Sequence, residues 1–400
     1  MPGLYEYYRG QQLLPTFADF QAAPELERYA AQRAAVLRDR AGLPAAMFHG
    51  AEILEFGPDS GENALVFAMW GAQLTLVEPN ERAHATIRAY FERFGRGASL
   101  RGISSAHVLD YEDPARYDLV VAEGFIYTVQ PTRAWLAAFH RLLRADGLFF
   151  ITYYERCGAI FELALRALQR AHQRLTGLDA EASAQRLYAA KWDAIPHTRR
   201  FESWVMDVLE NPFVRAATFL DARTLVDDMA AGGFDLYSSY PHYGDVLAME
   251  WHKREPSVEE RASRARAHIE RSTLSFLSGR KLYIGDAARA AAVAQDASGL
   301  VADIDALIDG DDTHASGRVI AALDGLAAAV HDVSIVADSR AERRAAAEAF
   351  ASFAHAFRLA ASGDAGALVR HTQTDAAFIA NWGQPVHLAV GRALPATFGR

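Results

Sequence analysis

Short runs of apolar residues, each ending in acidic or small residues, recur through the first part of the chain. Residues 53–56 and 73–77 are two such runs, and residues 117–124 and 147–154 are two longer ones. These runs are continuous rather than alternating, which is typical of parallel strands that helices cover on both faces. The pattern therefore predicts an α/β fold with a parallel sheet.

Further patterns predict the elements around this sheet. Residues 107–111 form another short apolar run and are predicted as a strand, while residues 81–94 and 133–143 have helical spacing. Residues 234–240 and 246–252 are strand-like runs joined by a short link, which predicts a closing antiparallel hairpin. Strand and helix patterns thus alternate, as they do in a doubly wound sheet.

The end of the first predicted strand carries the strongest candidate for a binding site. Glu55 is followed by Gly57 and Gly61, and a helical pattern begins directly after the second glycine. A sharp turn there presents backbone N–H groups at a helix N-terminus, where they can hold an anionic or polar ligand. Glu78, at the end of the next strand, suits the hydroxyls of a ribose. The sequence therefore predicts a cleft for a nucleoside cofactor.

Two common nucleotide-binding motifs are absent from the chain. It contains neither the Gly-x-Gly-x-x-Gly of dinucleotide enzymes nor the Gly-x-x-x-x-Gly-Lys-Ser/Thr of a phosphate loop. Instead, residues 55–61, Glu-Phe-Gly-Pro-Asp-Ser-Gly, resemble the first motif of the class I S-adenosylmethionine-dependent methyltransferases, acid-x-Gly-x-Gly-x-Gly. Asp59 stands at the middle glycine of that motif. The resemblance covers about residues 5–253.

The resemblance implies a fold and a cofactor. The fold is a doubly wound, Rossmann-like sheet of seven strands, with five parallel units followed by a closing antiparallel hairpin. The cofactor is S-adenosyl-L-methionine. Its methionyl part would lie near Gly57 and Gly61, and its ribose hydroxyls would bind Glu78.

Other cofactor contacts carry over from the family in the same way. Asp110 and Tyr111 would flank the adenine, while Glu123 and Tyr127 would face the transferred methyl group. The full set of residues expected to bind the cofactor is Tyr5, Tyr8, Glu55, Gly57, Asp59, Gly61, Glu78, Asn80, Asp110, Tyr111, Glu123 and Tyr127.

The N-terminus and a long insert depart from a minimal member of the family. Tyr5 and Tyr8 precede a helical pattern, and their rings could cover the cofactor and contact its sulfonium, or pack on the outer face of the domain instead. The insert, at about residues 156–221, contains a dense mixture of aromatic and ionisable residues at 191–204. We expect that stretch to be a lid and substrate wall, with a structural clamp on the helix at 203–209 as the alternative.

A general base is needed only if the accepting atom carries a proton at pH 7. The candidates are His197, Tyr153 and Glu155, and a neutral imidazole has the best matched pKa. A lone histidine is nevertheless more often structural, and a thioether acceptor would need no base.

The composition changes near residue 255. Residues 256–400 are rich in alanine and show about four helical patterns, followed at 386–390 by a short strand-like run. We therefore expect two domains: a methyltransferase domain at 1–255, with the N-terminal cap and the lid insert, and a helical domain at 256–400. The helical domain would form an oligomer interface, for which we favour a homodimer, or complete the substrate pocket.

Composition and charge exclude several classes of protein. A net charge of −9 argues against nucleic acid as a partner, and the strand end at 122–125 lacks the Asn/Asp-Pro-Pro-Tyr/Phe of amino-methylating DNA enzymes. The single cysteine, Cys157, rules out a disulfide within the chain, and we expect no metal site. Without a leader pattern or a long apolar stretch, we expect a cytoplasmic protein that does not bind membranes.

Together these features predict an enzyme that methylates a small-molecule or glycan acceptor. The accepting atom would be oxygen or nitrogen, or a thioether sulfur, in bacterial secondary or surface metabolism. One alternative is a cofactor-binding regulatory or assembly protein of the same fold that transfers no methyl group. A nicotinamide oxidoreductase is disfavoured, because residues 57–61 cannot supply the turn that binds a pyrophosphate.

Overall fold

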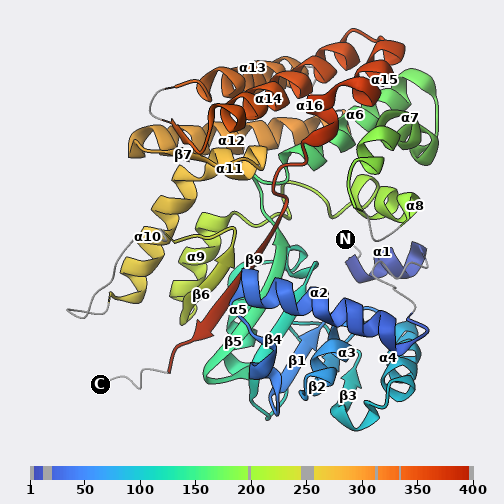
Figure 1. Ribbon diagram of the computed structural model, residues 1–400, viewed down its shortest axis with the longest axis vertical. Coiled ribbons are helices and arrows are strands. Elements are labelled where there is room, and N and C mark those ends of the chain that lie inside the picture. Colours follow the sequence, from blue (N-terminus) through green and yellow to red (C-terminus); the bar gives the residue numbers. More distant parts are fainter. Residues whose placement is uncertain are drawn as a thin grey trace. The chain divides into compact units, whose positions relative to one another are not determined.

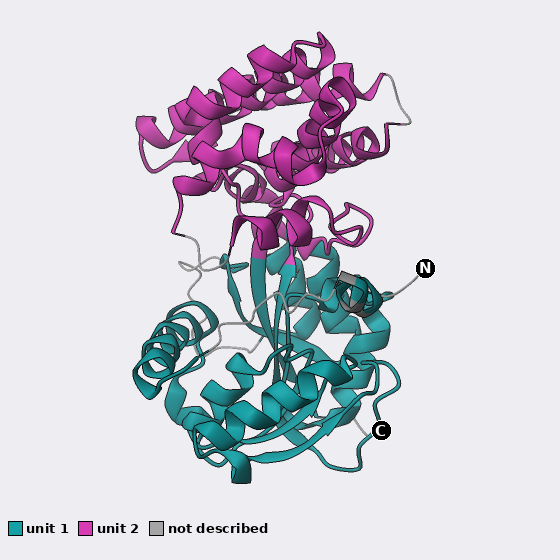
Figure 2. Ribbon diagram, turned by 90° about the vertical axis from the view of Figure 1, so that its right-hand side faces the viewer, with its two compact units in different colours: residues 1–153, 223–266, 387–400 teal, residues 154–222, 267–386 magenta. Residues whose placement is uncertain are grey.

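The computed structural model of the protein describes six stretches of the chain: residues 4–11, 20–196, 200–244, 256–310, 314–332 and 335–395. The contacts between Cα atoms divide the chain into two compact units, each built from separate segments (Figure 2). Unit 1 contains residues 1–153, 223–266 and 387–400, and unit 2 contains residues 154–222 and 267–386. No helix of the described residues is long and apolar enough to cross a membrane.

Unit 1 is built on a seven-stranded sheet with the strand order β3-β2-β1-β4-β5-β9-β6 (Figure 1). Its strands are β1 (Glu52–Phe56), β2 (Gln73–Val77), β3 (Leu100–Ser104), β4 (Tyr117–Glu123), β5 (Leu143–Tyr154), β6 (Phe234–Tyr240) and β9 (Val386–Ala393). The pairs from β3 to β5 are parallel, and β6 and β9 are antiparallel. The predicted α/β fold with a doubly wound, seven-stranded sheet is confirmed.

Helices follow the parallel strands, as the sequence pattern predicts. The helices of this part of the chain are α1 (Leu4–Gln11), α2 (Ala23–Ala41), α3 (Glu62–Met69), α4 (Glu81–Arg93), α5 (Thr132–Leu142), α9 (Ala222–Ala231) and α10 (Val258–Arg271). Three short 3-10 turns join them: Ala45–Phe48, Gly97–Ser99 and Ile126–Thr128. The central strand β1 shows why the runs are continuous, since Ile53, Leu54 and Phe56 are all completely buried.

The third strand is not where the sequence pattern placed it. The prediction of a strand at 107–111 was wrong, because that stretch contains a turn and β3 lies at Leu100–Ser104. Within the run, Val108 and Tyr111 are buried while Leu109 is 40% exposed. Buried positions three residues apart fit a turn, whereas a strand that is covered on both faces buries successive residues.

The antiparallel partner of β6 also comes from elsewhere in the chain. We expected a hairpin with residues 246–252, which lie outside the described residues. In the structure β9 pairs with β6, with Ser239 opposite Ala389, and lies between β5 and β6. The strand-like run at 386–390 therefore completes the sheet from a distant part of the sequence.

Unit 2 combines the insert after β5 with most of the alanine-rich region. Its helices are α6 (Ile160–Thr176), α7 (Ala180–Asp193), α8 (Phe201–Trp204) with a π-turn at Val205–Leu209, α11 (Thr273–Ser278), α12 (Ala287–Asp309), α13 (Ala315–Ala329), α14 (Arg340–Ala361), α15 (Ala365–Thr374) and α16 (Ala376–Ala380). A small pair of strands, β7 (Leu282–Ile284) and β8 (Ile335–Ala337), accompanies them. From α6, the Phe161 ring stacks on Phe353 of α14 with the ring centroids 4.3 Å apart. Insert and C-terminal helices thus share one core.

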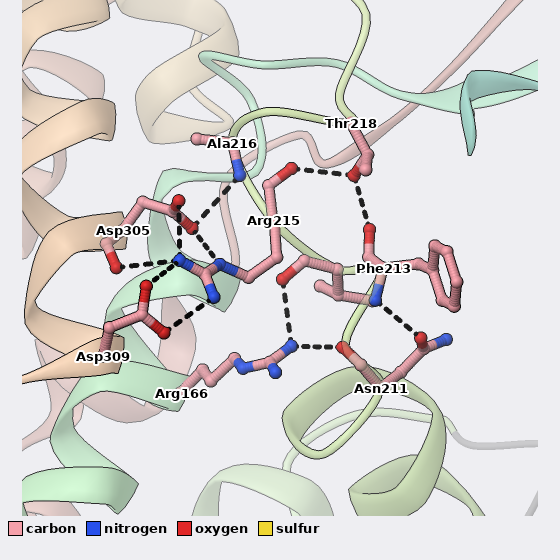
Figure 3. A network of polar contacts seen from close by, with 9 residues as sticks. Arg166, Asn211, Phe213, Arg215, Ala216, Thr218, Asp305 and Asp309 are labelled. Atoms are coloured by element: carbon pink, nitrogen blue, oxygen red, sulfur yellow. Dashed lines mark hydrogen bonds and ion pairs between the residues drawn. The ribbon is translucent and has the colours of Figure 1, made fainter. Parts of the chain in front are cut away.

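A polar network fastens the end of the insert to α12 (Figure 3). Arg215 donates from Nε to Asp305 Oδ1 at 2.7 Å and forms a second ion pair with Asp309. Arg166 of α6, which is buried, donates to the carbonyl oxygens of Asn211 and Val214. Because a buried guanidinium without such partners would be costly, these contacts define one path for residues 211–216.

Neither unit coincides with the expected ranges 1–255 and 256–400. The insert belongs to unit 2, and β9 belongs to unit 1. The reason is physical: α6 shares its core with α14, and β9 fills an interior position of the sheet.

Candidate functional site

The ends of four neighbouring strands bring the main predicted residues to one edge of the sheet. Phe56 of β1 lies opposite Val77 of β2 and opposite Ala122 of β4. The next residues along these strands are Gly57, Glu78 and Glu123, so they follow one another across this edge. Ligands of open parallel sheets bind outside the carboxyl ends of the strands.

The loop after β1 has the backbone shape that its glycines require. Gly57 and Gly61 have positive φ angles of 62° and 92°, and Gly61 caps the N-terminus of α3. A β-carbon at Gly57 would lie 2.6 Å from Cε1 of Phe125, and one at Gly61 would lie 3.0 Å from Ile87 Cγ1. Asp59 also has a positive φ, 52°, which aspartate tolerates better than most residues. The loop therefore keeps the glycine conformation at the position where the motif has changed.

Glu78 joins this loop to the start of α4. Its Oε1 accepts a hydrogen bond from the backbone N–H of Asn80 at 2.7 Å, and its Oε2 accepts one from that of Asp59 at 3.1 Å. The side chain is buried, and this burial raises the pKa of its carboxyl to about 7. Asn80 in turn caps α4, accepting from the Arg82 N–H at 3.3 Å.

Glu55 is the most unusual group at this edge. It is 2% exposed, and burial, followed by the charge of Glu123, raises its pKa to about 8. Among the described residues, its Oε2 has no hydrogen-bond partner. A buried carboxyl oxygen of this kind can accept a proton donor from a ligand at little further cost in desolvation.

The carboxylate of Glu123 is held by residues that the sequence analysis missed. Arg33 of α2 forms a two-pronged ion pair with Glu123, and Asn63 donates to the same carboxylate at 3.4 Å. Tyr29, one helical turn before Arg33, donates to Asn63 Oδ1 at 2.7 Å. Arg33 falls in the buried stripe of α2, between Ala30 and Leu37. An arginine at an apolar position of an amphipathic helix was the signal that could have found it.

The remaining expected cofactor residues have varied surroundings. Asp110 is exposed, whereas Tyr111 is buried beside Phe56, with its ring centroid 5.8 Å away. Tyr127 is buried in the turn after β4. Tyr8 is half-buried in α1, and the side chain of Tyr5 lies outside the described part of the chain.

The three candidate bases do not come together in one described site. Tyr153 is buried, and its hydroxyl bonds to that of Tyr243, which bonds to His387 Nδ1 at 2.6 Å. Glu155 belongs to unit 2, where it accepts from the Gly158 N–H at 2.7 Å, and its burial raises its pKa to about 7. His197 lies outside the described residues.

Both tryptophans of the expected lid are buried within unit 2. The Trp192 and Trp204 ring centroids are 5.3 Å apart, and Phe201 packs on both. The neighbouring Lys191 donates to the carbonyl oxygens of Phe378 and Ile379 at the end of α16. These contacts describe a packed cluster, and closure of this stretch over a ligand stays a prediction.

One cluster in unit 2 has the composition of a hydrolytic triad but not its hydrogen bonds. Ser352 Oγ donates to Asp375 at 2.7 Å, and His371 Nε2 lies 3.0 Å from the carbonyl oxygen of Ser352 and 3.1 Å from its Oγ. An Nε2–H that donates to this carbonyl cannot accept the serine proton. No group of three histidine, cysteine or acidic side chains in the described segments could hold a metal ion.

Comparisons with known proteins agree with the fold and the loop. The family profile for a methyltransferase domain matches residues 26–239, more than half of the chain. No curated protein sequence matches the chain.

Three solved structures illustrate the structural likeness. The N-methyltransferase NodS from Bradyrhizobium japonicum WM9, solved with S-adenosyl-l-homocysteine, is 16% identical with a TM-score of 0.29, over 37% of this chain and 74% of NodS. The CcbJ methyltransferase from Streptomyces caelestis is 19% identical with a TM-score of 0.26, over 29% of this chain and about half, 49%, of CcbJ. The [4+2]-cyclase SpnF is 12% identical with a TM-score of 0.36, over 91% of this chain and 80% of SpnF. On the match of the family profile, the chain belongs to the class I S-adenosylmethionine-dependent methyltransferase family.

Proposed function

We propose that the protein transfers a methyl group from S-adenosyl-L-methionine to a small-molecule or glycan acceptor. The observation that carries the proposal is the position of Glu78, a buried carboxylate tied by hydrogen bonds to the backbone of Asp59 and of Asn80. Each of its oxygens accepts one such bond and retains a further lone pair for a ribose hydroxyl.

The residues around Glu78 fit the other parts of this cofactor. Gly57 and Gly61 leave no room for a β-carbon, so the backbone itself forms the wall of the loop. Glu55 brings a buried carboxyl oxygen without a partner among the described residues. Near these groups, Glu123 is paired with the one guanidinium of Arg33. A site with more carboxyl groups than cations suits a ligand with a sulfonium and an ammonium group.

The bound cofactor would supply a methyl group made electrophilic by the positively charged sulfur. The protein then has to hold this group in line with the accepting atom and exclude water. We assign the ribose to Glu78, the methionyl part to the loop from Gly57 to Gly61, and the surroundings of the methyl group to Glu123 and Tyr127.

The acceptor is proposed on chemical grounds. The net charge of −9 disfavours a polyanionic acceptor such as nucleic acid, which leaves small molecules or glycans of bacterial secondary or surface metabolism. Transfer to oxygen would require a base, for which Tyr153, Glu155 and His197 remain the proposed candidates, whereas transfer to a thioether would not.

Replacement of Glu78 tests the cofactor assignment. In Glu78→Ala, S-adenosylhomocysteine should bind more weakly by about 1–3 kcal/mol, because the ribose hydroxyls lose their acceptor. Titration calorimetry measures this, with Glu81→Ala at an exposed position of α4 as the matched control. Unchanged affinity in a folded Glu78→Ala protein, or tighter binding of NAD than of S-adenosylhomocysteine, would refute the assignment.

Transfer itself needs a separate measurement. Incubation with S-adenosylmethionine labelled in the methyl group and with pools of metabolites should label an acceptor. Tight binding of S-adenosylhomocysteine without any labelled acceptor would instead favour a cofactor-binding protein that transfers no methyl group.

A further inference from the structure

The ring of Phe125 packs directly against the first glycine of the loop after β1. A β-carbon built on Gly57 would lie 2.6, 2.9 and 3.3 Å from three carbon atoms of this ring. Phe125 itself is only half-buried, so part of its ring remains open on the side away from the loop. An aromatic surface thus lies beside the stretch of backbone that a ligand of this edge has to approach.

The backbone around this ring is held firmly. The Gly124 N–H donates to Thr152 at both Oγ1 (2.8 Å) and the carbonyl oxygen (3.1 Å). The Phe125 carbonyl oxygen accepts from the N–H and from the hydroxyl of Thr128, both at 2.8 Å. Hydrogen bonds on both sides fix where the ring stands, which is the property expected of a preorganised binding surface.

The electrostatic surroundings of the ring favour a positive charge. Glu123 precedes it by two residues, and Glu55 ends the adjacent strand. A cation near the face of an aromatic ring is attracted by the negative potential of that face, and more strongly where water is partly excluded. A neutral sulfur in the same place would gain no such attraction.

We propose that Phe125 distinguishes S-adenosylmethionine from its demethylated product, by contact of the aromatic ring with the sulfonium group. This inference rests on the proposed function, since it assumes that the cofactor lies along the loop from Gly57 to Gly61. The ring gains attraction from the positively charged sulfonium and loses it when the methyl group has left and the sulfur is neutral. The same residue therefore favours binding of the methyl donor and release of the product.

Dissociation constants for the two ligands test this role of Phe125. In the full-length protein, Phe125→Leu should weaken binding of S-adenosylmethionine by about 3- to 30-fold and leave binding of S-adenosylhomocysteine nearly unchanged. Phe125→Tyr, which keeps an aromatic face, should retain the ratio of the parent protein. Both constants can be measured by titration calorimetry.

Controls separate this inference from its premise. Phe94→Leu makes the same chemical change at a partly buried position in the core of unit 1 and should alter neither constant. Equal losses for both ligands in Phe125→Leu, or no loss for either, would overturn the role of Phe125 while leaving the proposed function intact. A parent protein that binds neither ligand would overturn the proposed function itself.

Discussion

Single side chains at the strand ends are buried in ways that make their charge depend on pH. Glu55 and Glu78 both have raised pKa values, about 8 and about 7, because burial penalises their ionised forms. Carboxyl groups with little exposure would be poor choices for stabilising a fold alone. Their cost is expected where a ligand repays it, and perturbed groups of this kind cluster at functional sites.

Glu55 should make the protein less stable as the pH rises. Its pKa is raised from 4.5 to about 8 in the folded state, so the folded protein binds more protons than the unfolded chain between these values. The free energy of unfolding should fall through this window, by on the order of 4 kcal/mol for this group. Glu55→Gln, which cannot ionise, should flatten the fall.

Urea denaturation at pH 5 and at pH 8.5 measures this effect. Glu81→Gln, at an exposed position, should behave like the parent protein at both values. If Glu55→Gln and the parent lost the same stability between the two pH values, Glu55 would not be the group responsible.

Among the elements, α2 shows how one helix can stabilise the fold and shape the site together. Leu26, Ala30 and Leu37 of this helix are buried in the core of unit 1, and Arg33 reaches Glu123 from the same stripe. The helix therefore carries hydrophobic packing and a buried ion pair on one face. Loss of the guanidinium would leave the carboxylate buried without its cation.

Arg33→Ala should therefore destabilise unit 1, by about 2–4 kcal/mol of unfolding free energy. The matched control on the same helix is Arg38→Ala, because Arg38 pairs with Asp39 at an exposed position and should matter by less than about 0.5 kcal/mol. Chemical denaturation gives both values. The double variant Arg33→Met with Glu123→Leu should recover most of the loss, and a failure to recover would mean that the ion pair is not its cause.

Local patterns predicted some elements well and others poorly. Strands β1, β2, β4, β5 and β6 follow from apolar runs, because each run reflects burial of that strand alone. The position of β9 between β5 and β6 could not be predicted, since a short run does not reveal which distant strand it joins. Arg33 was missed because a single arginine in a helix usually faces water.

At the scale of the whole molecule, the chain leaves unit 1 after β5 and returns to it more than once. It returns for α9 and β6, and again for β9. Unit 2 is therefore joined to the sheet at several points of the sequence. Removal of the alanine-rich region would also remove an interior strand, so the two predicted domains cannot simply be separated at residue 255.

Truncation tests this dependence. A chain of residues 1–385 lacks β9, and the gap between β5 and β6 should prevent cooperative unfolding and binding of S-adenosylhomocysteine. A chain of residues 1–395 keeps β9 and should resemble the full-length protein. Circular dichroism during heating and calorimetry compare the two, and a cooperative, ligand-binding 1–385 protein would show that β9 is dispensable.

The place of β9 also has a consequence for how this protein is made. A ribosome releases β1 to β5 early, yet the sheet cannot join β5 to β6 until the chain has been synthesised as far as residue 393. A nascent chain therefore carries the glycine loop long before the sheet beneath it is complete. Any product of premature termination would lack the strand that closes this gap, and the cell would hold no shortened version able to compete for the cofactor.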